Sequence, residues 1–405
     1  MSFNFQQQRI LICQPIISYL GGSTVVTIEL AEYLQNQGAQ VTIYTCSYDQ
    51  PAKKFCQQKK LTVLTASDQP ELHINDFDYI WVNSQILPQS FLTDFKHQQQ
   101  ARFIFCHLSA IDWIPDERPW IYELEEKICS LQLFIAENTK DFNQGFINKT
   151  LPYKFFRNPA PDVYATLTPH HSSHYPHKIL IVSNHQPAEL LVVQRILQHQ
   201  NIQVQILGEI NPKPDLINPQ YIADNDVVIT IGKTVQYCLV AGTPVYIYDH
   251  FGGPGYLDDS NYQQAKEHNF SGRGTNKKDP QTIIEELMNN YQQALQFHRQ
   301  NRQKFCQEFL LSQTLPDIFV SVPATTIAPF DDKYLKAVSL CQDLAIKYFQ
   351  TVTREALSKT REKKLGQELH NIYSSKTWQL KKILSHWSAP RRFFKTKIHT
   401  FSSRK

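Results

Sequence analysis

The chain has 405 residues, more than one ordinary hydrophobic core supports, so its length predicts two domains and an appendage. The net charge of +4 is unevenly spread: residues 1–350 contain 27 Lys and Arg against 34 Asp and Glu, whereas residues 351–405 contain 14 against 3. The acidic balance of the first part argues against a body that binds nucleic acid, and the basic balance of the second predicts contact with an anionic partner.

The eight cysteines are scattered, include no CxxC pair and lie mostly in or beside apolar runs. We therefore expect reduced thiols in the core of a cytoplasmic protein. The opening residues, MSFNFQQQRI, lack the pattern of a signal peptide. No apolar run approaches the ~20 residues that a membrane-spanning helix needs.

The first strand is predicted at Arg9 to Cys13, because the run RILIC is short and continuously apolar. A turn at Gly21-Gly22-Ser23 precedes helical spacing from Val25 to Leu34, and Val41 to Thr45 predicts the next strand. Strand, glycine turn, helix and strand make the βαβ unit of a doubly wound sheet. The turn would place backbone amides at a helix N-terminus, where a diphosphate or an acceptor oxygen can bind; a merely tight turn is the alternative.

More strands are predicted at Leu61 to Thr65, Tyr79 to Val82, Phe103 to Cys106 and Leu131 to Ala136. His107 directly follows the third of these. A histidine at the carboxyl end of a central strand can act as a general base or bind a sugar hydroxyl, so His107 is the candidate catalytic group here. Asp112 is a second candidate nearby, and a purely structural histidine is the alternative for His107.

Residues 161–177 predict a polar linker rich in His, Ser and Pro, in which we expect no metal site. A second doubly wound set begins with a strand at Lys178 to Ser183, a helix and a strand at Val204 to Leu207. We expect one doubly wound domain in residues 1–160, a second in 178–325 and a helical, basic tail in 326–405. Ligands of such open α/β sheets bind at the carboxyl edge of the strands.

The stretch from Asp226 to Gly274 carries most of the candidate chemistry. An apolar run ends at Gly232-Lys233-Thr234, and a second strand is predicted at Val245 to Tyr248. Two glycine loops follow, HFGGPG at 250–255 and NFSGRG at 269–274. Strands that end in loops with glycine, lysine and arginine predict a phosphate-bearing ligand.

This stretch resembles the donor half of GT-B-fold glycosyltransferases from bacterial surface-polysaccharide loci. The Gly21-Gly22-Ser23 turn and the segment Arg157-Asn158-Pro159 resemble the other half, and YSSKTWQLKKILSHW resembles a segment often appended to such enzymes. The resemblance implies two Rossmann-like domains that face a cleft, an acceptor domain in residues 1–160 and a nucleotide-sugar domain in residues 178–325. It also implies transfer of a sugar from a nucleotide-sugar donor to a glycan or lipid-linked acceptor, with no metal or other cofactor. Many retaining members carry a glutamate where this chain has Tyr237, so the stereochemistry, retaining or inverting, stays open.

Glycosyl transfer leaves negative charge on a diphosphate, which a transferase must stabilise. Lys233, between a strand and a helix, and Arg273, between two glycines, are our candidates for catalytic charged contacts, together with His107. Turn or solvent-facing roles are the alternative for each. The resemblance and the positions at strand ends predict further donor-binding residues: Asn184, Thr234, Gln236, Tyr237, Asp249, His250, Gly252, Gly253, Gly255, Asn269, Ser271 and Gly272.

The tail predicts a helix over residues 333–372 and then interleaves aromatic residues with Lys and Arg. That pattern is typical of a segment at an anionic leaflet, so we expect residues 374–405 to bind the inner face of the plasma membrane rather than nucleic acid. Two other functions stay open: a sugar-nucleotide epimerase of similar fold, and a non-catalytic scaffold that binds sugar nucleotides. The sequence names neither the donor sugar and base nor the acceptor.

Overall fold

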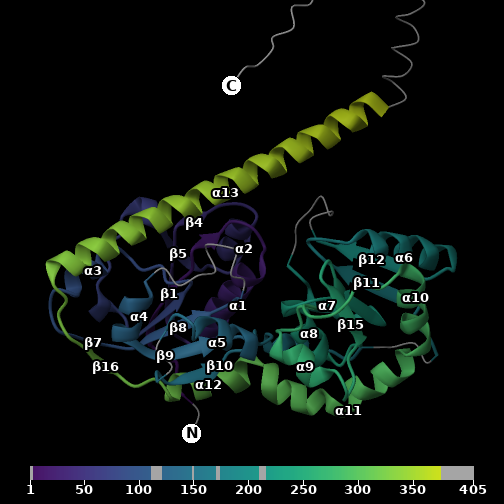
Figure 1. The fold of residues 1–405 in the computed structure, drawn as a ribbon, viewed down its shortest axis with the longest axis horizontal. Coiled ribbons are helices and arrows are strands. Elements are labelled where there is room, and N and C mark those ends of the chain that lie inside the picture. The colour runs from purple at the N-terminus through teal and green to yellow at the C-terminus, as the bar shows by residue number, and fades with distance from the viewer. Residues whose placement is uncertain (1–2, 111–120, 148–149, 170–173, 209–215, 375–405) are drawn as a thin grey trace, which may run out of the picture. The chain divides into compact units, whose positions relative to one another are not determined.

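The computed structural model describes residues 3–110, 121–147, 150–169, 174–208 and 216–374. It divides into two compact units, residues 1–350 and residues 351–405. The first unit, called the body below, contains two large β-sheets with helices packed on them (Figure 1). The second unit is described only to residue 374 and is helical up to there.

The first sheet has seven parallel strands in the order β10-β9-β8-β6-β1-β3-β5. Its apolar strands are buried on both faces, as strands of a parallel sheet covered by helices must be. The predicted strands are confirmed, each within two residues at either end. They are β1 (Arg9–Cys13), β3 (Gln40–Thr45), β5 (Thr62–Thr65), β6 (Tyr79–Asn83), β8 (Phe103–His107) and β9 (Cys129–Phe134). The edge strand β10 (Tyr153–Phe155) is not predicted from the sequence.

The helices of this part begin with α1, which starts within the predicted glycine turn, at Gly22. Just before that turn, β2 forms a short parallel pair with β4. These elements are α1 (Gly22–Asn36), α2 (Ala52–Gln58), α3 (Phe91–Asp94), α4 (Tyr122–Ile128), α5 (Glu137–Asn143), β2 (Ile16–Ile17) and β4 (Ser47–Tyr48).

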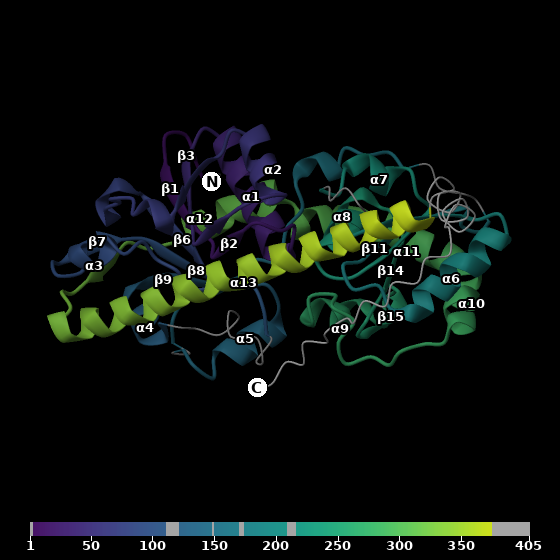
Figure 2. The same ribbon diagram turned by 90° about the horizontal axis from the view of Figure 1, so that it is seen from above.

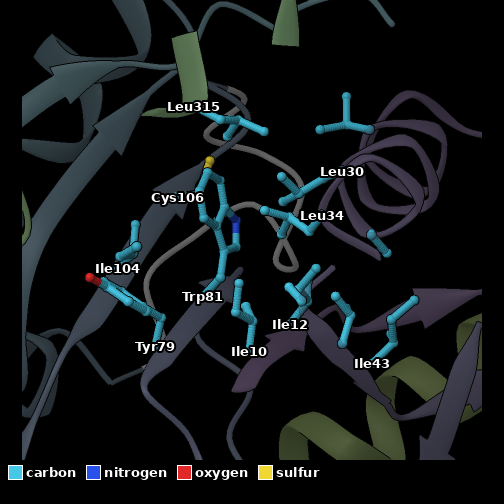
Figure 3. Close-up of a cluster of buried hydrophobic side chains, with 14 of the residues drawn as sticks. Ile10, Ile12, Leu30, Leu34, Ile43, Tyr79, Trp81, Ile104, Cys106 and Leu315 are labelled. Carbon is cyan, nitrogen blue, oxygen red and sulfur yellow. The ribbon is translucent and has the colours of Figure 1, made fainter. Parts of the chain in front are cut away.

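The core of the first sheet surrounds Trp81, which is fully buried (Figure 3). Its ring meets the ring of Phe156 edge to face at 5.0 Å, and its indole nitrogen donates to Asn83 at 3.0 Å. Leu30 and Leu34 of α1 pack on the same cluster. Removing a buried side chain of this size typically costs about 3–5 kcal/mol, so this cluster is a main source of stability for the first sheet.

The second sheet has five strands in the order β12-β11-β13-β14-β15. The first four are parallel, whereas β15 is antiparallel to β14. The sequence predicts a loop at 250–255, and the structure differs, because most of this segment pairs with β14 as β15. Helices α6 and α10 lie side by side on one face (Figures 1 and 2), together with the start of α11, and α7, α8 and the rest of α11 pack on the other. The strands are β11 (Lys178–Val182), β12 (Gln203–Leu207), β13 (Val227–Thr230), β14 (Val245–Asp249) and β15 (Gly252–Tyr256). The helices are α6 (Ala188–His199), α7 (Pro219–Ala223), α8 (Lys233–Ala241), α9 (Tyr262–Glu267), α10 (Pro280–Asn289) and α11 (Tyr291–Phe309).

After α11 the chain returns to the first sheet. Helix α12 (Leu311–Val320) places Leu315 in the core around Trp81, and β16 (Thr325–Ile327) pairs antiparallel with β7 (Gln99–Ala101). The sequence assigns residues 311–325 to the second domain, and the structure differs, because these side chains fill the first core. We call the part built on the first sheet the first half of the body, the part built on the second sheet the second half, and residues 157–160 the crossing segment.

Helix α13 (Asp332–Ser374) confirms the helix predicted at 333–372. Its first turns pack on the first half: Leu335, Val338 and Ala345 are buried, and the Gln342 amide bonds the backbone of Gln85 and of Leu87. Among the described residues no helix is both long and apolar enough to cross a membrane. Residues 375–405, which include most of the predicted membrane-binding tail, lie outside the described residues.

The cysteines offer a direct check of this fold. All eight are free thiols and six of them are buried, as the sequence predicts, whereas Cys341 is exposed. Burial raises the pKa of Cys56 to about 11 and that of Cys46 to about 12, which removes the reactive thiolate.

We expect a maleimide to label Cys341 within minutes and the half-buried Cys306 more slowly, with the other six labelled only on unfolding. Rapid labelling of three or more thiols in the native protein, followed by peptide mass spectrometry, would contradict the fold.

Candidate functional site

Open α/β sheets bind ligands at the carboxyl edge where the strand order reverses, and in the second sheet this reversal lies between β11 and β13. Ser183, Asn184 and His185 follow β11 at this edge, and Gly232 leads from β13 into helix α8. The first-turn amides of α8 therefore lie at the carboxyl edge, where an anion is favoured by the helix dipole. The predicted residues Thr234, Asp249 and His250 belong to the same edge, through α8 and the end of β14.

Asp249 holds this edge together. Its carboxylate is 3% exposed and accepts a hydrogen bond from the Ser183 hydroxyl, with 3.0 Å to each oxygen. The backbone amide of His250 donates to the same carboxylate at 2.7 Å. Asp249 thus ties the loop after β11 to the end of β14 across β13, which accounts for its burial; a contact with a sugar hydroxyl stays a prediction. Sequence reasoning missed Ser183, whose only signal is its place at a strand end.

Two imidazole rings lie at the surface of this edge. The rings of His185 and His250 meet edge to face at 5.2 Å, and the ring of His250 contacts that of Phe251 at 3.8 Å. The guanidinium of Arg273 lies 4.5 Å from the Phe251 ring centre. The exposed Asn184 and this set of rings and cation are the groups of the edge that can meet a ligand.

Several glycines of the two loops pack closely against other parts of the protein, whereas Gly274 has open space beside it. A Cβ atom on Gly253 would lie 1.9 Å from the Ile247 carbonyl oxygen, and one on Gly272 would lie 2.6 Å from that of Gly252. Gly252 and Gly255 have φ of +95° and +89°, a region that favours glycine. Because these glycines have no side chains, β14 can pair closely with β15 and Arg273 can lie over Phe251. Contact of these glycines with a donor stays a prediction.

Asn269 and Ser271 shape the second loop. The Asn269 side chain accepts from the amide of Asn158 at 3.1 Å, and the carbonyl of Phe270 accepts from Gly232 N at 3.0 Å. The Ser271 hydroxyl accepts from the backbone of Arg273 at 3.4 Å. This loop is thereby anchored both to the crossing segment and to the start of α8.

Lys233 does not point into open space. Its ammonium lies 2.8 Å from Glu29 of α1 and donates to the carbonyls of Asn158, at 3.1 Å, and Pro159. Only 9% of its side chain is exposed, and this burial lowers the pKa of Lys233. In this arrangement its donors are taken up by the protein, so its predicted contact with a diphosphate would require it to leave these partners.

Tyr237 and Gln236 face the same junction. The Tyr237 hydroxyl donates to Glu29, and its ring stacks on Tyr164 at 4.1 Å. The Gln236 amide donates to the carbonyl of Arg157 at 3.2 Å. Sequence reasoning missed Glu29, because nothing along the chain pairs a residue of the first helix with residues about 200 positions later.

In the first half, His107 is 8% exposed and its Nε2 lies 2.9 Å from Glu125 of α4. The ring of His107 stacks on Phe134 with centroids 5.2 Å apart. Glu125 is fully buried and also accepts from the amides of Gln132, at 2.9 Å, and Gln85. Glu125 is thus the centre of a buried polar network that fixes the orientation of the His107 ring. Sequence reasoning missed Glu125, because no local pattern marks a residue whose partners come from other segments of the chain.

The Gly21-Gly22-Ser23 turn begins α1 at the carboxyl side of β1, with Gly21 as the N-cap. A Cβ atom on Gly22 would meet nothing within 4 Å, so this backbone is open to approach. Asp112 and the histidines at 170 and 171 lie outside the described residues. Among the residues that the structure places, no three His, Cys, Asp or Glu side chains could share a metal ion.

Comparison with known proteins defines the fold. No family model matches the chain, and no curated protein sequence matches it. The Anabaena protein Alr3699/HepE, solved with UDP and glucose, is similar with a TM-score of 0.51 and 13% identity, over 78% of this chain and 100% of that one. The same protein with UDP gives the same values. The glycotransferase of kitacinnamycin has a TM-score of 0.46 and 12% identity, over 80% of this chain and 100% of that one. The body has the GT-B fold with two Rossmann-like α/β domains, which confirms the predicted fold class.

Glu125 can be tested through stability. Replacing Glu125 with Ala leaves the polar atoms of Gln85, Gln132 and His107 buried without their acceptor, so we expect a loss of about 3 kcal/mol in the free energy of unfolding. Glu123→Ala, on the exposed face of the same helix, should change it by less than about 0.5 kcal/mol. Equal denaturant midpoints for the two variants would show that the network does not hold this part of the structure.

The glycine packing gives a second test. Gly253→Ala forces a methyl group against the carbonyl of Ile247, and we expect a destabilisation of about 2 kcal/mol in urea unfolding. Gly22→Ala is the matched control, because its methyl group meets nothing and alanine favours the helix. A Gly253→Ala protein as stable as Gly22→Ala would contradict the account of this loop.

Proposed function

We propose that the chain is a glycosyltransferase that moves a sugar from a nucleotide-sugar donor to a glycan or lipid-linked acceptor. The observation that carries the proposal is the edge of the second sheet, where the N-terminus of α8, Arg273 and two imidazoles lie together at the position of strand reversal. The complexes of HepE with UDP and glucose support a uridine nucleotide sugar as the first donor to test.

The donor half supplies the positive charge. As the bond between the sugar and the diphosphate breaks, negative charge grows on the leaving group. Arg273 and the first-turn amides of α8 are placed to stabilise it, with His185 and His250 as further donors when protonated. Thr234 at the start of α8 and Asn184 after β11 contribute polar contacts. Lys233 acts here mainly by fixing the position of α8, since its ammonium is bound to the protein.

The acceptor half supplies the proton acceptor. His107 takes the proton of the acceptor hydroxyl, and Glu125 at Nε2 keeps the ring oriented and stabilises its charged form. With Nε2 held by Glu125, Nδ1 is the nitrogen that would receive the proton. The Gly21-Gly22-Ser23 turn, with backbone open to approach, is a place for acceptor or phosphate oxygens. Neither retention nor inversion is favoured by these groups.

The biological setting that we propose is assembly of a bacterial surface polysaccharide at the inner face of the plasma membrane, by a cytoplasmic enzyme that needs no metal or other cofactor. The basic and aromatic residues of 374–405 motivate the membrane contact. An epimerase or a binding scaffold would use the same donor edge but would not need His107. Measuring turnover with and without an acceptor therefore distinguishes the three functions.

Nucleotide binding is the primary test. We expect UDP to bind in calorimetry and Arg273→Ala to weaken it about tenfold to a hundredfold, because a charge-assisted contact is lost. Arg299→Ala, exposed on α11, is the control and should leave the affinity unchanged. If neither UDP, GDP, ADP nor CMP binds more tightly than millimolar, the proposed donor edge is wrong.

Turnover then distinguishes the functions. A transferase releases UDP faster with a glycan acceptor than without one, and His107→Ala should lower that rate at least about a hundredfold, the usual contribution of a general base. Conversion of the nucleotide sugar into its epimer without acceptor would point to the epimerase, and tight binding with no turnover across a donor panel to the scaffold.

A further inference from the structure

One carboxylate of the first half reaches into the donor half. Glu29 of α1 contacts two residues of α8, the ammonium of Lys233 at 2.8 Å and the hydroxyl of Tyr237. The Glu29 and Lys233 side chains are 11% and 9% exposed, and Tyr237 is 2% exposed. The same ammonium donates to the crossing segment at Asn158 and Pro159. Three parts of the body therefore meet at one buried charge.

The free-energy cost of burying this ion pair indicates that it has a specific role. Taking a carboxylate and an ammonium out of water is expensive, and a buried ion pair rarely adds net stability compared with apolar side chains of the same size. Such pairs are best explained where they specify one arrangement over others. Here the pair joins α1 to the first turn of α8, so what it specifies is how the two halves meet.

Not all of the polar groups buried at the junction have hydrogen-bond partners. The side-chain oxygens of Asn158 and Gln236 are buried and find no hydrogen-bond partner among the described residues. A buried acceptor without a partner costs about 1–3 kcal/mol, a cost that hydration would remove. The closed junction therefore competes with an opened one in which these amides are hydrated, and the Glu29 contacts oppose that opening.

We infer that Glu29 is a positioning residue of the transfer reaction, supplied by the first half to fix α8 and the donor edge against the acceptor half. The inference rests on the proposed function. It predicts that Glu29 affects transfer but not nucleotide binding. The donor groups Arg273 and His250 belong to the second half alone, so nucleotide binding does not need Glu29. Transfer between the halves does need it.

The test compares Glu29→Gln with Glu32→Gln. The control is matched, because Glu32 lies on the same helix and pairs with Lys59 entirely within the first half. Hydrogen exchange is measured first, without ligand. The amides of Asn158 and Ala160 are hydrogen-bonded to Phe156 and Phe309, so they report on opening of the crossing segment. We expect Glu29→Gln to speed their exchange about tenfold, Tyr237→Phe to speed it less, and Glu32→Gln to leave it unchanged.

The second arm uses UDP and the transfer assay. We expect Glu29→Gln to keep the UDP Kd within about twofold of the original protein, with one site per chain in calorimetry, while kcat falls about tenfold. Glu29→Asp, which keeps the charge, should recover part of that kcat. If Glu29 only stabilised the fold, Glu29→Gln would instead lower both the number of UDP sites per chain and kcat.

Three results would overturn the inference. The first is unchanged exchange in Glu29→Gln, and the second is exchange raised equally in β1 and β13, which is general destabilisation. The third is tighter UDP binding, which would show that Glu29 withholds Lys233 from the diphosphate. If UDP does not bind even the original protein, the proposed function fails, yet the exchange arm still decides whether Glu29 holds the junction.

Discussion

The buried ammonium of Lys233 constrains both halves of the body at once. It lies among a carboxylate of α1, two carbonyls of the crossing segment and, at 5.1 Å, the ring of Tyr237. A charge removed from water must keep its partners, since losing one leaves the others with an uncompensated charge at a cost of several kcal/mol. The start of α8 is therefore bound to the first half as well as to its own sheet. Because the donor edge is built on that helix, its position relative to the first half depends on residues that lie far away in the sequence.

Close packing of backbone sets the rest of the edge. Gly253 allows close packing on the carbonyl of Ile247 in β14, and Gly272 allows the second loop to pack on the carbonyl of Gly252. This second approach brings Arg273 onto the ring of Phe251. Asp249 then joins the loop after β11 to the end of β14. These contacts leave few conformations for the cation and the two imidazoles, so the edge is organised before any ligand arrives, which lowers the ordering cost of binding.

The sequence predicts the two sheets well, because short apolar runs and glycine turns carry local signals of strand and helix. It predicts that Lys233, Tyr237 and Gln236 contact the donor; the structure places them on α8 with protein partners at the junction, and contact with a donor stays a prediction. It cannot predict their partners. Glu29, Glu125 and Ser183 act through contacts between distant segments, and a single sequence holds no record of such pairs. The same limit applies to Gly252 and Gly255: their pattern predicts close approach of something, and the structure shows backbone and side chains of the protein there.

The separation of groups between the halves has a chemical consequence for the proposed reaction. The proton acceptor, His107 with Glu125, is fixed by α4 and β8, whereas the cation for the leaving diphosphate, Arg273, is fixed by the loop after α9. Transfer requires both groups at one sugar carbon, and an error of about 1 Å in such a placement can cost a hundredfold in rate. Neither sheet can set that distance alone. In the proposed reaction it is set where the halves join, by the crossing segment and by the contacts of α1 with α8, and we infer that the buried charge at this junction controls the geometry of a reaction whose reacting groups it does not touch.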